Sequence, residues 1–153
     1  MKKMKKIIIL VFCAFLLIGA SIYGTYIYYN NIYHNLIKYE EKLLDIKLEN
    51  YIENVDGYII LDTAEYAVVK MKVIKGCEED IIKKFDAEFG MRIVPQSPPL
   101  AYPTNLLEYE LNTKKPEYLY ELLLPGTNGQ MTRDVRIFIV KDGDGFMYIY
   151  FIG

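Results

Sequence analysis

The sequence predicts an α+β fold: an N-terminal transmembrane helix, then a small domain in which one or two helices cover a curved antiparallel sheet. Two observations carry this prediction. Residues 7–29 contain no charged side chain, and a helix of that length spans the roughly 30 Å hydrocarbon core of a bilayer. After residue 56, strand-like segments that are apolar or alternate apolar with polar residues flank one segment with helical spacing, as expected for a sheet with a helix packed on it.

The N-terminus predicts the position of the chain in a membrane. Four lysines precede the apolar run, and the next basic residue is Lys38. The positive-inside rule therefore predicts a cytoplasmic tail at residues 1–6, an anchor at 7–29 and an extracytoplasmic chain after it. Tyrosine favours the membrane–water interface, because its ring is apolar and its hydroxyl is hydrated. Five tyrosines are expected to form such a belt at the outer end of the anchor: Tyr23, Tyr26, Tyr28, Tyr29 and Tyr33.

A cleaved signal peptide is the main alternative to the anchor. Gly19-Ala20-Ser21 offers small residues to a peptidase, but the apolar run continues for eight residues beyond Ser21. Signal peptides have apolar cores of only about 7–15 residues. A lipoprotein leader is disfavoured, because the bulky Phe12 directly precedes Cys13. The sequence therefore favours a permanent anchor and leaves open a secreted domain, released by cleavage near Ala20-Ser21.

The segment after the anchor has the spacing of an amphipathic helix. Apolar residues recur at steps of three and four over residues 30–55, which predicts a helix with one apolar stripe. This helix either continues the anchor as one rod or breaks at Asn30-Asn31. We expect the remaining domain to begin at residue 56 and to end at residue 153.

On that predicted helix, acidic residues four apart form a ridge of like charges, which destabilises a helix by about 0.2–0.5 kcal/mol per pair: Glu41, Asp45, Glu49 and Glu53. Glu49 and Glu53, with Asp56 just beyond, lack basic neighbours on the helix. These three form the candidate interaction face for a basic partner. The alternative is that Lys70 and Lys72 of the next predicted strand neutralise them.

Strands and one further helix follow. Strands are expected at 57–61 and 66–75 with a turn near Asp62–Glu65, followed by a helix at 77–89 and a proline-rich extended connection at 92–104. Two hairpins complete the domain: 106–112 with 117–124, and 134–141 with 146–152, the second closed by the glycine-rich turn Asp142–Gly145. This order of elements resembles the nuclear-transport-factor-like and cystatin-like folds, in which a curved sheet wraps a helix.

The last hairpin is apolar on both faces. A strand pair of this kind lies either at the centre of a sheet that is covered on both sides, or at an oligomer or partner interface. The sequence leaves these alternatives open.

The residues needed for common catalytic and metal sites are scarce. The only histidine is His34, next to the tyrosine belt, and the only serines are Ser21 and Ser97. A serine or cysteine triad and a zinc site both need more of these residue types. Asp142 and Asp144 are explained by the hairpin turn, because an EF-hand requires further oxygen ligands along its loop. We therefore expect no catalytic residue, no metal and no cofactor.

One thiol remains a candidate for chemistry. Cys77 stands at the predicted start of the helix at 77–89, where backbone N–H groups stabilise a thiolate, whereas the acidic residues that follow it oppose that effect. Cys13 lies within the predicted membrane segment, so no disulfide is expected within one molecule. Cys77 is thus a candidate accessible thiol.

Charge excludes two classes of partner. All 20 acidic residues but only 14 of the 18 basic ones lie after the tail at residues 1–6, which gives that part of the chain a formal charge of −6. Nucleic acids and anionic lipid surfaces repel such a domain. The composition, rich in Ile, Lys, Asn and Tyr, suggests an AT-rich bacterial genome.

The sequence therefore predicts a single-pass protein of the bacterial cell envelope that is a non-enzymatic binding or assembly module, with an envelope protein or a second copy as partner. A pilin-like structural subunit is the alternative, because an apolar helix that runs into an amphipathic one and then a sheet is similar to type IV pilins. The chain departs from that pattern, since no glycine precedes Ile7.

Overall fold

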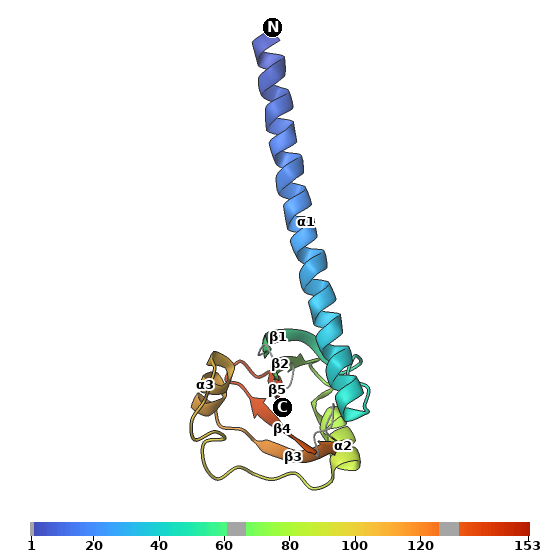
Figure 1. Cartoon of the computed structure of the whole chain (residues 1–153), viewed down its shortest axis with the longest axis vertical. Helices are drawn as coiled ribbons and strands as arrows, with labels where there is room; N and C mark the ends of the chain where they lie inside the picture. The colour runs from blue at the N-terminus through green and yellow to red at the C-terminus, as the bar shows by residue number, and fades with distance from the viewer. Residues whose placement is uncertain (1, 61–66, 126–131) are drawn as a thin grey trace. The chain divides into compact units, whose positions relative to one another are not determined.

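The computed structural model describes residues 2–60, 67–125 and 132–153 (Figure 1). The chain divides into two compact units, residues 1–44 and residues 45–153, and each is described by itself. The predicted turn near Asp62–Glu65 lies outside the described residues.

The first unit is a single helix, α1 (Lys2–Leu44), of 43 residues. It is continuous through Asn30-Asn31, so of the two possibilities the unbroken rod is found. Among the described residues, the helix over Val11–Leu44 is long enough to cross a membrane and contains an 18-residue window that is apolar enough, with a mean hydropathy of 1.7, a property that signal sequences share.

The predicted helix over 30–55 is wrong in its second half. α1 ends at Leu44, and Asp45 has a φ of 55°, the left-handed conformation that ends many helices and that Asp adopts more readily than most residues. From Ile52 the chain forms a strand. The stripe at helical spacing continued past Leu44 because apolar residues of the turn and of the strand happen to fall at the same steps.

The second unit confirms the α+β class. A five-stranded antiparallel sheet with two short helices has the strand order β1-β2-β5-β4-β3. The elements, in chain order, are β1 (Ile52–Ile60), β2 (Ala67–Val73), α2 (Glu78–Phe89), α3 (Leu106–Thr113), β3 (Tyr118–Pro125), β4 (Thr132–Lys141) and β5 (Met147–Ile152).

One predicted hairpin is confirmed and the other is wrong. Lys141 pairs with Met147 across the glycine-rich turn, in which Gly145 has a φ of 82°. Residues 106–112, however, belong to α3 rather than to a strand. Helix formation is favoured there because the side chain of Asn105 accepts a hydrogen bond from the Glu108 N–H and so caps the helix. β3 therefore pairs with β4 and not with residues 106–112.

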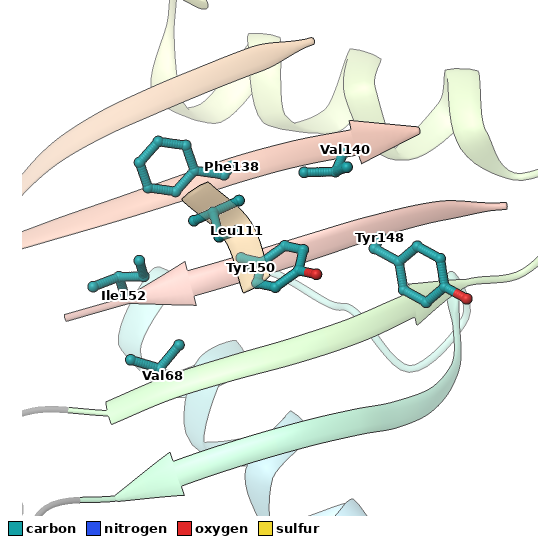
Figure 2. Packing of buried hydrophobic residues seen from close by; sticks show 7 residues of the cluster. All are labelled: Val68, Leu111, Phe138, Val140, Tyr148, Tyr150 and Ile152. Carbon is teal, nitrogen blue, oxygen red and sulfur yellow. The ribbon is translucent and has the colours of Figure 1, made fainter. Parts of the chain in front are cut away.

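The two faces of the sheet bury different side chains. On the α3 face, Leu111 packs with Val68 and with alternate residues of β4 and β5, namely Phe138, Val140, Tyr148, Tyr150 and Ile152. Figure 2 shows these side chains rising from three neighbouring strands.

On the α2 face, Phe85 of α2 stacks edge-on against Tyr120 and Phe151, with ring centroids 5.6 and 6.4 Å away. All six residues of β5 are buried. The apolar last hairpin thus occupies the centre of the sheet, and its two faces are the two sides of the core.

The proline-rich connection forms one bridge and bends at 96–97, 99 and 101–102, so it is less extended than predicted. Ile93 forms a single antiparallel bridge with Leu119 of β3, through two backbone hydrogen bonds of 2.8 Å. The chain then leaves the sheet edge at Pro95, because proline has no N–H to continue a ladder.

Candidate functional site

A lysine is buried in the middle of β2. Antiparallel pairing sets Lys70 opposite Tyr150 and Lys72 opposite Tyr148, and directly opposed residues share one face of a sheet. That face is the one that α3 covers, so Lys70 is only 7% exposed. A buried lysine is rare unless its charge is paired.

The charge of Lys70 is paired twice. Its Nζ lies 2.8 Å from Asp56 Oδ2 on β1 and 2.8 Å from Glu110 Oε1 on α3. The Tyr150 hydroxyl donates to the same Glu110 oxygen at 3.1 Å. The Tyr148 ring adds a cation–π contact, with its centroid 4.6 Å from Nζ. Three elements thus meet at one ammonium group.

A second lysine extends this network toward the turn after β4. Lys114 Nζ donates a hydrogen bond to Asp142 Oδ2 and lies 3.4 Å from Glu110 Oε1. Asp144 accepts hydrogen bonds from the Phe146 N–H at 2.8 Å and from the Tyr148 hydroxyl at 3.1 Å. Both turn aspartates therefore have donors within the protein, which accounts for them without a bound cation.

We call this set the Lys70 network; its members are Asp56, Lys70, Glu110, Lys114, Asp142, Asp144, Tyr148 and Tyr150. Burial by itself would lower the pKa of Lys70, but the hydrogen bonds to Asp56 and Glu110 outweigh it, and the pKa is raised well above its ordinary value. Burial by itself would raise the pKa of Glu110, but the hydrogen bond with Lys70 and its positive charge outweigh this effect, and the pKa is lowered. These groups are fixed charges near neutral pH, suited to holding elements together rather than to proton transfer.

The tyrosines of the network stay protonated over a wide pH range. Burial is the largest cause that raises the pKa of Tyr150, and the nearby Glu110 carboxylate adds to it. Burial, with a hydrogen bond to Asp144, raises the pKa of Tyr148 to about 12. Their hydroxyls therefore act as hydrogen-bond donors and not as bases.

An open surface cavity of about 220 Å³ lies between the two connections that flank α3; its lining is Pro95, Gln96, Ser97, Pro98, Asn112, Lys114, Lys115 and Pro116. Two of its polar side chains are already engaged. Asn112 bonds to the backbone of Leu100, and Lys114 to Asp142. The cavity has Lys115 as its remaining charged side chain.

The three residues of the candidate interaction face do not lie on one helix. Glu49 lies in the turn after α1, whereas Glu53 and Asp56 lie on β1. Glu53 pairs with Lys72 at 3.0 Å and Asp56 with Lys70 at 2.8 Å, which is the alternative that the sequence left open. The predicted ridge of acidic residues on one helix face is therefore wrong, while a docking role for Glu49, Glu53 and Asp56 stays a prediction.

Cys77 is the N-cap residue of α2, as predicted, but its side chain makes no capping hydrogen bond, since its backbone has φ −99° and ψ 3° rather than the extended N-cap conformation. It is a half-buried free thiol, and Cys13 is a free thiol on α1. Within the residues that the structure describes, no three His, Cys, Asp or Glu side chains come together as metal ligands.

The tyrosines of the predicted belt all lie on α1. At about 100° per residue, Tyr23, Tyr26, Tyr29 and Tyr33 project to one side of the helix and Tyr28 to the other. Tyr28 and Tyr29 make an edge contact with centroids 5.8 Å apart, and Tyr33 makes one with His34 at 5.2 Å.

The sequence indicated a possible pairing of Lys70 with Asp56, but it did not indicate that the other members of the Lys70 network join them. Lysine alternates with apolar residues in β2, a pattern typical of a strand with one face in water, so burial of Lys70 was not expected. The signal that was available lay in β5: a strand that is apolar on both faces implies that both faces are covered, including the one that carries Lys70.

Comparison with known proteins yields no match to a family model, to a curated protein or to a solved structure. Function is therefore argued from the helix α1 and from the domain of residues 45–153 alone.

Proposed function

We propose that this chain is a single-pass membrane protein of a bacterial cell envelope. Its N-terminus lies in the cytoplasm, and its domain of residues 45–153 lies outside, where it binds or assembles with another envelope protein and has no catalytic activity of its own. The observation that carries the proposal is the unbroken apolar surface of α1.

Along the predicted anchor, α1 presents large apolar side chains on every side. Six of them are between 57% and 71% exposed: Phe12, Phe15, Leu16, Leu17, Ile18 and Ile22. Moving one such side chain from water into an apolar medium is favourable by roughly 1.5–3 kcal/mol. A bilayer provides that medium for the whole circumference of a helix, which supports insertion.

The flanks of the apolar run support the orientation. The lysines before it favour the cytoplasmic side, and the tyrosines at its other end suit the outer headgroup layer. The apolar run also continues for eight residues beyond Ser21, longer than the apolar core of about 7–15 residues in signal peptides, which supports a retained anchor over a removed signal peptide.

The domain supports a binding role more than a catalytic one. Its most strongly perturbed charges, those of Lys70 and Glu110, are paired with each other, so neither offers a free base or nucleophile. Several apolar side chains of the domain are exposed, including Met91 at 94% and Tyr102 at 90%. Methionine and tyrosine are among the residue types enriched at protein interfaces.

Labelling of intact cells tests the anchor and its orientation. In a variant with Cys13→Ser and Cys77→Ser, Met91→Cys supplies one exposed thiol. We expect a membrane-impermeant maleimide to modify the full-length protein in intact cells and the intact mass to include residues 1–20. The cysteine-free variant is the matched control for labelling of other groups.

Four other results would each contradict one part of the proposal. A protein about 20 residues shorter would be a secreted domain released near Ala20-Ser21. A protein that has lost only its first six residues would point to the pilin-like alternative. Labelling only after lysis would reverse the orientation. Recovery of a monomer alone after cross-linking in native membranes would contradict assembly with a partner.

A further inference from the structure

We propose that residues 95–116, which comprise α3 and its two flanking connections, form a flap that opens from the sheet as one unit while the rest of the domain stays folded. The contact between Lys70 and Glu110 is the latch of this flap. The inference concerns the domain of residues 45–153 and holds whether α1 is retained or cleaved.

The flap holds itself together through its own hydrogen bonds. The Asn112 side chain receives a bond from the Leu100 N–H at 2.9 Å and donates one to the Leu100 carbonyl. Glu108, only 3% exposed, accepts from the Thr104 hydroxyl at 2.6 Å. The first connection is thus folded against α3 rather than hydrogen-bonded into the sheet, so the helix and its connection move together.

The attachment of the flap to the sheet is small. α3 has eight residues, and isolated helices shorter than about 12–15 residues are marginal in water, so α3 depends on its contacts with the sheet. Leu107 and Leu111 face the sheet, whereas Leu106 and Tyr109 are 81% and 64% exposed. Leu100 of the first connection also packs against the apolar cluster, so the apolar attachment of the flap comes from three leucines.

Five of the six prolines of the chain lie within the flap. Proline cannot donate to a strand ladder, so the connections are not held by the cooperative pairing that joins the five strands. The last ladder contact before the flap is the bridge between Ile93 and Leu119. After the flap, the Glu117 N–H bonds to the Ile139 carbonyl at 2.8 Å. These two contacts mark where opening stops.

The latch is the strongest polar contact across this boundary. Glu110 on the flap bonds to Lys70 and Tyr150 on the sheet, and Lys114 on the flap bonds to Asp142. Hydrogen bonds between ionised groups are about twice as strong as neutral ones. Release of both contacts would uncover the apolar cluster below, so the closed state predominates and opening is a minor excursion.

Hydrogen exchange of the full chain in detergent micelles, followed by mass spectrometry, tests the flap. Local opening free energies range from near zero up to the global value, so we expect amides in 106–113 to exchange on the order of 100-fold faster than those in β2 and β5. Glu110→Gln keeps an acceptor for Tyr150 and removes the charge. It should speed exchange within 95–116 by roughly tenfold or more. Because it destabilises the closed state relative to every opened state, amides of β2 and β5 that exchange by global unfolding should speed up by no more than that factor and stay slower than those of the flap.

A matched control and a second variant sharpen the test. Glu121→Gln alters an exposed glutamate on β3 and should change neither rate. Gly57→Ala places a Cβ 3.0 Å from Leu107 Cδ2 and should speed exchange of the flap by a separate route. Equal protection of flap and sheet in the unmodified chain would overturn the proposal, because α3 would then unfold only with the whole domain. Unchanged exchange of the flap in Glu110→Gln would overturn the assignment of the latch.

Discussion

Lys70 holds its charge where the sheet is covered, and the surrounding side chains explain how. Two carboxylates lie at 2.8 Å from its Nζ, and the face of one tyrosine lies at 4.6 Å. Removal of one partner of a buried ion pair strongly destabilises a protein, because the remaining charge stays buried without compensation. Lys70 therefore ties β1, β2 and α3 to one another.

Lys70→Met tests this tie. The thioether fills similar space but leaves Asp56 without its lysine and Glu110 with only the more distant Lys114, so we expect the free energy of unfolding to fall by about 2 kcal/mol. Urea denaturation of the full chain in detergent, followed by circular dichroism, measures the loss. Lys75→Met, at an exposed lysine after the same strand, is the control and should change it by less than about 0.5 kcal/mol.

Gly153 is a second residue with little tolerance. Its N–H and C=O both bond to Ala67, and a Cβ at this position would lie 2.7 Å from Val135 Cγ2. Gly153→Ala should therefore destabilise the domain by roughly 1–3 kcal/mol through overpacking. In a Val135→Ala background the same change should cost little, which a double-mutant cycle measures. Equal costs in both backgrounds would show that steric contact with Val135 is not the cause.

At the scale of elements, the sequence was sufficient for β2, α2, β3, β4 and β5. β2 and α2 each have a clear period, whereas β4 and β5 are short apolar runs joined by a glycine-rich turn. It was insufficient for α3. Residues 106–112 form a short run in which strand and helix periods cannot be told apart, and the deciding signal is Asn105 followed three residues later by Glu108, a capping pattern. The end of α1 was missed for the opposite reason, since its stripe continues by chance into β1.

Asn105→Ala tests whether the cap sustains α3. The side chain accepts a 3.0 Å hydrogen bond from the Glu108 N–H, and loss of an N-cap of this kind costs about 1 kcal/mol. We expect exchange of the amides in 106–109 to rise by about fivefold, as that energy implies, and exchange in β5 to rise by no more than that factor. Asn105→Asp retains an acceptor at the helix start and should restore protection. Failure of Asp to do so would mean that the cap is not what stabilises the helix.

At the scale of the whole domain, the polar and apolar parts of the core are divided between the two faces of one sheet. The α2 face is aromatic and aliphatic around Phe85 and Phe151, while the α3 face combines an apolar cluster with the Lys70 network. The sequence left open whether the last hairpin lies at the centre of a covered sheet or at an interface. It could not show which distant residues, such as Glu110 and Lys70, meet there, because that depends on how α3 lies across the strands.

The Lys70 network makes the stability of the domain depend on pH in a defined way. The pKa values of Glu110 and Asp142 are lowered by folding, so their stabilisation is present above their ordinary values and is lost as pH falls below about 4.5. The pKa values of Lys70, Tyr148 and Tyr150 are raised by folding, so their stabilisation is present below about pH 10 and is lost as pH rises above it.

We therefore expect a plateau of stability between about pH 5 and pH 10 with a fall on either side, measured as the urea midpoint of the full chain in detergent at pH 3, 7 and 11. Glu110→Gln should lower the plateau and reduce the acidic fall, because the group that would be protonated is gone. Tyr150→Phe should reduce the alkaline fall, because the phenol that resists ionisation in the folded state is gone. A midpoint at pH 3 or pH 11 that equals or exceeds the value at pH 7 would mean that the paired charges beneath α3 contribute nothing to holding the domain together.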